Sequence, residues 1–67
     1  MQYLRIHNKV KELRLLHGFT QAELAGKINS SKWIVSLLER ELSNPSKQTA
    51  ENLSKTFSLP VNKIFYI

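Results

Sequence analysis

The stretch FTQAELAGKINSSKWIVSLLER, residues 19–40, carries the start signals of two helices and a short turn between them. Thr20 and Glu23 have the spacing of a capping box, in which the threonine hydroxyl accepts a hydrogen bond from a first-turn amide and the carboxylate accepts one from the amide of Thr20. Phe19 and Leu24 flank this cap at the spacing of a hydrophobic staple. We therefore predict a helix that begins directly after Thr20.

This helix is short, and another follows it at once. Its apolar stripe consists of Leu24, Ala25 and Ile28. Asn29 tolerates a positive φ angle and can end the helix, while Ser31 can cap the next one. Two helices joined by a turn of about three or four residues cannot lie antiparallel, so they cross steeply as in a helix-turn-helix.

A further helix is predicted before this pair. Val10, Leu13 and Leu16 recur at three-residue steps with charged residues between them, which is typical of an amphipathic helix. Asn8 is a suitable N-cap, and Gly18 is suited to a left-handed helix end.

Two more helices are predicted after the pair. Ser43-Asn44-Pro45-Ser46 is a turn cluster, and Ser46, or Asn44 if Pro45 is the first helical residue, caps a fourth helix whose buried stripe is Ala50, Leu53 and Phe57. Residues 58–60 break that helix, and a brief fifth turn or helix follows with Val61, Ile64 and Phe65 inward. Residues 1–7 are predicted as a short strand or extended arm.

The chain has 67 residues, a net charge of +5 and no cysteine. This length predicts one domain, residues 1–67, whose core supplies only about 3–5 kcal/mol of net stability, so dimerisation would be a natural reinforcement. The charge favours a polyanionic partner. No apolar run is long enough for a membrane span or a signal peptide, so we expect a cytoplasmic protein without membrane contact.

The residues offer little for catalysis or metal binding. His7 and His17 have neither cysteine partners nor helical pair spacing, and no nucleophile–base pair or glycine-rich phosphate loop is visible. We therefore expect no metal, no cofactor and no enzyme activity.

Residues 19–46, FTQAELAGKINSSKWIVSLLERELSNPS, resemble the Cro/repressor-type (XRE-like) helix-turn-helix of phage repressors and bacterial regulators. In that family a hydrophobic residue precedes Thr/Ser-Gln-x-Glu-Leu-Ala, and a serine after the turn opens a helix that closes on Glu-Arg. Residues 11–14 and 59–65 fit the family's first and last helices. The resemblance implies an all-α, compact five-helix, lambda-repressor-like DNA-binding domain, with the helix-turn-helix at about residues 20–40 and the helix of residues 32–40 in the major groove.

The resemblance implies two kinds of DNA contact. Base contacts are expected of Lys32, Trp33, Ser36 and Leu37. Phosphate contacts are expected of Gln21, Ser31, Arg40, Asn44, Ser46 and Lys47. Each polar member also has an ordinary explanation as a solvated side chain or a helix cap, because a cap satisfies helix amides without any ligand.

Arg14 and Glu39 resemble the family's partly buried Arg–Glu pair, which implies a structural ion pair between the first helix and the end of the third. Two positions depart from the family pattern: Glu41 and Asn29 stand where glycine is common. Glu41 would bring a negative charge and a Cβ close to the expected DNA side.

Trp33, Ile34 and Leu37 are larger and more apolar than the residues that the family more often carries on this helix. One explanation is contact with thymine methyl groups, with Trp33 packed on sugars or base edges. A second is a protein-binding surface, because tryptophan is enriched at interface hot spots. In a third, Ile34 turns inward beside Leu38 and only Trp33 and Leu37 are exposed.

The primary hypothesis is a small homodimeric transcriptional regulator, in the first place a repressor, that acts by occupying a roughly palindromic operator in double-stranded DNA. The apolar C-terminal end is the expected dimer interface, aided by residues 1–7. Its members are Leu59, Val61, Ile64, Phe65, Tyr66 and Ile67. The alternative is a protein-binding module on the same fold, antitoxin-like or anti-repressor, that uses Trp33 and Leu37.

Overall fold

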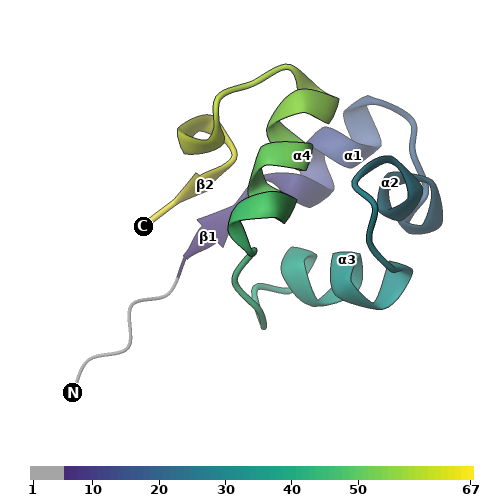
Figure 1. The fold of residues 1–67 in the computed structure, drawn as a ribbon, viewed down its shortest axis with the longest axis horizontal. Coiled ribbons are helices and arrows are strands. Elements are labelled where there is room, and N and C mark those ends of the chain that lie inside the picture. The colour runs from purple at the N-terminus through teal and green to yellow at the C-terminus, as the bar shows by residue number, and fades with distance from the viewer. Residues whose placement is uncertain (1–5) are drawn as a thin grey trace.

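The computed structural model describes residues 6–67, which form four α-helices, one 3-10 turn and two short strands (Figure 1). In chain order these are β1 His7–Asn8, α1 Val10–Leu16, α2 Gln21–Lys27, α3 Lys32–Glu39, α4 Lys47–Phe57, η1 Val61–Lys63 and β2 Phe65–Tyr66. The predicted helix-turn-helix is the pair α2 and α3. In the view of Figure 1, the two strands lie to one side of α4 and α2 lies to the other, while α3 runs along the lower edge.

The predicted brief fifth turn or helix forms as the single 3-10 turn η1, so the count of five helices is wrong, and Val61, which was expected to face inward, is 39% exposed. The backbone is held back from further coiling at Ile64, whose carbonyl accepts the amide of Lys9 at 2.9 Å. The side chain of Ile64 is completely buried, and the next two residues pair with β1. Pairing between the two chain ends therefore replaces the last helix.

β1 and β2 form an antiparallel pair in which His7 lies opposite Tyr66 and Asn8 lies opposite Phe65. The rings of His7 and Tyr66 pack with their centroids 5.6 Å apart. The strand or arm expected at residues 1–7 is thus a strand at His7, and its first five residues lie outside the described part of the chain.

The core lies between the four helices and η1. Its fully buried apolar side chains are Val10, Leu24, Ala25, Ile28, Val35, Leu38, Leu53, Phe57 and Ile64. Seven of them belong to the apolar stripes of α2, α3 and α4, and Val10 from α1 and Ile64 after η1 complete the core. Ala50, predicted in the stripe of α4, is half-buried.

The predicted stripe of α1 is wrong at Leu16, which is 81% exposed. Three-residue steps fall about 60° short of a full turn each time, so by Leu16 the stripe has rotated about 120° away from Val10. Leu13 is half-buried, and the inward place in the last turn is taken by Arg14.

All four α-helices end in the same way, with a residue in the left-handed conformation. These residues are Gly18, Asn29, Glu41 and Ser58, with φ angles of 73°, 59°, 59° and 55°. In each case the following amide donates to the carbonyl five residues earlier, at 2.8–3.1 Å, which is the Schellman arrangement. A Cβ makes this conformation costly, so three of the four ends hold some backbone strain.

Candidate nucleic-acid interface

α3 is fixed in rotation by its inward residues and by its cap. Val35 and Leu38 are buried in the core, and the hydroxyl of Ser31 accepts the amide of Ile34 at 3.2 Å. The side chain of Glu39 is also buried, whereas Lys32, Trp33 and Arg40 are exposed and Ser36 and Leu37 are half-buried. Side chains four apart in a helix lie in line. We name the line of Lys32, Ser36 and Arg40 the cationic stripe, and that of Trp33 and Leu37, extended by Leu42, the apolar stripe.

The cationic stripe is open to solvent at both ends. Lys32 and Arg40 are exposed, and Ser36 between them is half-buried. Arg40 Nε makes a long hydrogen bond of 3.4 Å to the carbonyl of Ser36. Neither cation forms an ion pair with any carboxylate of residues 6–67. Both are therefore available for an anionic partner.

The apolar stripe begins with Trp33, which is 66% exposed. Leu37 is half-buried and Leu42 is exposed. The amide of Leu42 donates to the carbonyl of Leu37 at 3.0 Å, and this Schellman bond is commonly accompanied by a hydrophobic contact between the same two residues. The explanation in which Ile34 turns inward and only Trp33 and Leu37 are exposed holds only in part: Ile34 lines a pocket together with Leu38 but is still 36% exposed, and Leu37 is half-buried.

A buried hydrogen-bond network joins α3 to α1 and α2. Arg14 Nε donates to Glu39 Oε2 at 2.6 Å and Arg14 Nη2 donates to Glu39 Oε1 at 3.3 Å, so the expected ion pair is bidentate. The side chains are only 10% and 4% exposed. Arg14 Nη1 also donates to the carbonyl of Phe19 at 2.9 Å. Removing either charge would leave the other poorly solvated, which gives the pair a structural role.

Gln21 is part of the same network. Its Nε2 donates to Glu39 Oε1 at 3.1 Å, and the residue is half-buried at the first position of α2. Thr20 and Glu23 complete the predicted capping box, with bonds of 3.0 Å and 2.8 Å. If Gln21 contacts a phosphate as expected, its side-chain amide must do so while it remains hydrogen-bonded to Glu39.

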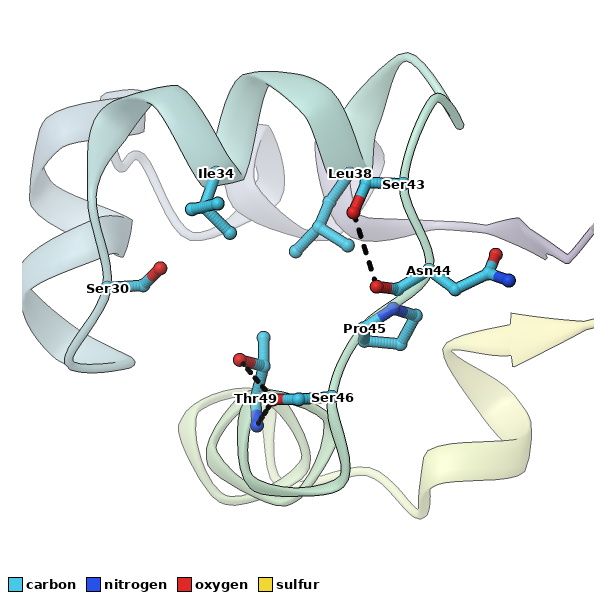
Figure 2. A pocket seen from close by; sticks show the side chains of 8 residues that line it. All are labelled: Ser30, Ile34, Leu38, Ser43, Asn44, Pro45, Ser46 and Thr49. Atoms are coloured by element: carbon cyan, nitrogen blue, oxygen red, sulfur yellow. Dashed lines mark hydrogen bonds between the residues drawn. The ribbon is translucent and has the colours of Figure 1, made fainter.

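A pocket of about 250 Å³ separates α3 from the start of α4 (Figure 2). Figure 2 shows Ile34 and Leu38 pointing from α3 toward Ser46 and Thr49, with Pro45 beside them. Ser46 caps α4 by accepting the amide of Thr49 at 3.1 Å. The expected phosphate ligands Asn44, Ser46 and Lys47 are exposed at this end, and Asn44 and Ser46 line the pocket together with Ile34 and Leu38 of α3.

The structure moves the charge of Glu41 away from the outer face of α3. Its carboxylate lies 2.9 Å from His7 Nδ1 and accepts the amide of Asn8 at 3.0 Å. The Asn8 side chain in turn donates to the carbonyl of Leu38 at 2.7 Å and accepts the amide of Val10 at 3.0 Å. β1 is thereby joined both to the end of α3 and to the start of α1.

Sequence reasoning missed this connection because its partners are 30 or more positions apart. Asn8 does bond to the first turn of α1, but the N-cap position itself is Lys9. Neither a periodicity nor a capping motif can show that Glu41 meets His7, since that contact exists only once the two chain ends are paired.

The residues expected at a dimer interface differ in how exposed they are to solvent. Tyr66 and Ile67 are exposed, and Val61 is less so. Leu59 and Phe65 are half-buried. Ile64 is completely buried inside the protomer and therefore has no surface to place against a second chain.

In the part of the chain that the structure describes, no three His, Cys, Asp or Glu side chains gather where a metal ion could be held. A search of the same residues finds no helix with the length and hydropathy needed to cross a membrane.

The hydrogen bond from the Thr20 amide lowers the pKa of Glu23 below its usual value of 4.5, and the Thr20 hydroxyl and Lys27 act in the same direction. The charged form of Glu23 is thus the one that stabilises the start of α2.

Two helices joined by the four-residue turn 28–31, a capping box and a third helix with an exposed face define a helix-turn-helix protein. Comparison with known families agrees: the family described as "Helix-turn-helix" matches residues 10–64, so the chain belongs to this family and the XRE-like resemblance is confirmed.

Similar proteins carry names of the same kind. The chain is 34% identical to an uncharacterised HTH-type transcriptional regulator of Methanocaldococcus jannaschii, over 87% of this chain and 88% of that protein. It is 32% identical to the uncharacterised HTH-type transcriptional regulator YgzD of Bacillus subtilis, over 90% of this chain and 91% of that protein. A third relative of this description, from Archaeoglobus fulgidus, is 28% identical over 90% of this chain and 86% of its own length.

Proposed function

We propose that this protein is a small dimeric transcriptional regulator that binds double-stranded DNA sequence-specifically, with α3 in the major groove, and represses by occupying its operator. The observation that carries this proposal is the charge distribution around α3. Glu23, Glu39 and Glu41 all accept hydrogen bonds from their own protein, whereas Lys32 and Arg40 keep their charges exposed. The outer face of α3 is therefore cationic in a way that suits a polyanion.

The proposed contacts follow from position on this surface. Lys32, Trp33, Ser36 and Leu37, on the outer face of α3, would contact bases. Gln21, Ser31, Arg40, Asn44, Ser46 and Lys47, at helix ends around that face, would contact phosphates. Phosphate contacts set the register of the protein on the duplex, and base contacts supply the specificity.

The dimer would be built from the C-terminal end, where Val61, Tyr66 and Ile67 offer the exposed surface and Leu59 and Phe65 lie beneath it. Ile64 would support this interface from the core. Two-fold symmetry would then place two copies of α3 about 34 Å apart, one turn of the duplex, on a roughly palindromic operator. A regulator of this kind acts in the cytoplasm, where the DNA of bacterial and archaeal cells lies.

The test is the salt dependence of binding to a mixed-sequence duplex, followed by fluorescence anisotropy of the labelled DNA. The logarithm of the affinity should fall linearly with the logarithm of the salt concentration, with a slope of about −0.9 for each phosphate contacted. Replacing Arg40 by alanine should reduce this slope by about 1.

The matched control is Lys55→Ala, because Lys55 is an exposed cation in the last turn of α4, away from the proposed contacts. This variant should keep the slope of the unmodified protein. Absence of any DNA affinity at low salt would refute the proposal. That result would favour the protein-binding alternative, for which Trp33 and Leu37 would supply the surface, extended by the exposed Leu42.

A further inference from the structure

The apolar stripe is an unusual surface for a helix that faces DNA. Trp33 and Leu42 are largely exposed, and Leu37 lies in line with Trp33 one helical turn away. Most groups on base edges in the major groove are hydrogen-bond donors and acceptors, which an alkyl side chain cannot satisfy. The thymine C5-methyl group is the apolar feature of that groove.

The stripe is also well fixed. The Schellman bond at the end of α3 joins the backbones of Leu37 and Leu42, an arrangement that commonly brings the two side chains into hydrophobic contact. The indole N–H of Trp33 donates no hydrogen bond to any residue of 6–67, which leaves it available for a base or backbone acceptor.

The charges beside the stripe decide in favour of DNA over a protein as its occupant. The cationic stripe runs parallel to it on the same helix, with two exposed cations and no ion pair among the described residues. Any partner that covers Trp33 and Leu37 must therefore also approach Lys32 and Arg40. Duplex DNA offers methyl groups in the groove and phosphates at its edges, and so matches both stripes at once.

We propose that Trp33 and Leu37 are specificity-determining residues that read thymine methyl groups, so that each operator half-site carries two thymines on the side of the groove that faces the apolar stripe. Residues four apart in a helix are separated by about 6 Å along its axis. Successive bases on one strand are about 3.4 Å apart, so the two thymines lie about two steps from each other. This inference rests on the proposed function.

The experiment removes only the methyl groups. Duplexes selected by the protein from a random library are resynthesised with deoxyuridine in place of one thymidine at a time, which keeps every hydrogen-bonding group of the base. Loss of a buried methyl group should weaken binding about fourfold at each of two positions. Uracil at the other positions should leave the affinity unchanged.

Two variants assign the positions. In Trp33→Ala the affinity should no longer distinguish thymine from uracil at one of the two positions, and in Leu37→Ala the same should hold at the other. Lys32→Ala is the control, because it should weaken binding to both probes equally and keep the fourfold ratio. Thermal unfolding of each variant establishes that it is folded; if Leu37→Ala unfolds, Trp33→Ala decides alone, because Trp33 is mostly outside the core.

The inference fails if uracil changes the affinity less than twofold at every position while binding remains steeply salt-dependent, and the proposed function then stands. If neither the selected nor the mixed duplex binds at low salt, both fail together.

Discussion

Replacing Glu41 by glycine is expected to destabilise the protein, although glycine is the residue best suited to its backbone conformation. At a φ of 59° the Cβ of Glu41 strains the backbone, and glycine would relieve about 1–2 kcal/mol of that strain. The greater flexibility of unfolded glycine reduces this gain by about 0.5–1 kcal/mol. The backbone effect of the substitution alone would therefore stabilise the folded protein by roughly 0.5–1 kcal/mol.

The loss is larger. Glu41 gives up its contacts with His7 Nδ1 and with the amide of Asn8. Hydrogen bonds to a charged group are worth about 1.5–3 kcal/mol when buried. Since the His7 and Glu41 side chains are 43% and 24% exposed, we discount each bond to about 1 kcal/mol. The net effect is a loss of about 1 kcal/mol, which lowers the Tm of a domain this size by about 4–8 °C.

The assay is thermal unfolding at neutral pH, monitored by circular dichroism, with Asn29→Gly as the matched control. Asn29 has the same φ of 59°, is exposed, and makes no side-chain hydrogen bond within residues 6–67. Because asparagine accepts the left-handed conformation at lower cost than glutamate, the relieved strain and the flexibility of unfolded glycine nearly cancel, and Asn29→Gly should leave the Tm almost unchanged. If Glu41→Gly lowered the Tm no more than Asn29→Gly does, the carboxylate would contribute nothing and the reasoning would be refuted.

Three further predictions concern the other named interactions. Glu39→Ala should cost about 3–5 kcal/mol because it leaves Arg14 buried without its partner, and a thermal scan that shows no loss would contradict the structural role of this pair. Ser46→Ala should cost about 0.5–2 kcal/mol, measured by urea unfolding, because the amide of Thr49 loses its acceptor; an unchanged midpoint would mean that water replaces the cap. Because the folded pKa of Glu23 is lowered, its contribution to stability is present above pH 4.5 and lost as the pH falls through the folded pKa. Glu23→Gln should remove that part of the acid dependence, and a titration by NMR that finds a pKa at or above 4.5 would show the cap bond to be absent.

Local signals accounted for most of the helical structure. The capping box at Thr20, the caps at Ser31 and Ser46 and the left-handed end at Gly18 each involve residues within about five positions of one another. Such contacts can be inferred from spacing because helix geometry alone brings the residues together. The same holds for the apolar stripes of α2, α3 and α4.

Long-range contacts accounted for most of the errors. The last helix was expected because Val61, Ile64 and Phe65 have helical spacing, but pairing with β1 gives the backbone of Phe65 a different partner. The error at Leu16 is a local one, because three-residue steps drift around a helix and place Leu16 on the exposed face of α1. At the candidate site, the outward residues of α3 could be named in advance, whereas the direction in which Glu41 and Gln21 turn their polar groups could not.

The network around Glu39 has a mechanical consequence. One carboxylate binds the side chain of Arg14 from α1 and of Gln21 from α2, so α3 cannot slide or tilt against either helix without breaking buried bonds. A recognition helix held in this way would meet its operator as a stiff surface. Any mismatch in curvature would then be taken up by the DNA, and sequences that bend easily would be favoured even at base pairs that no side chain touches.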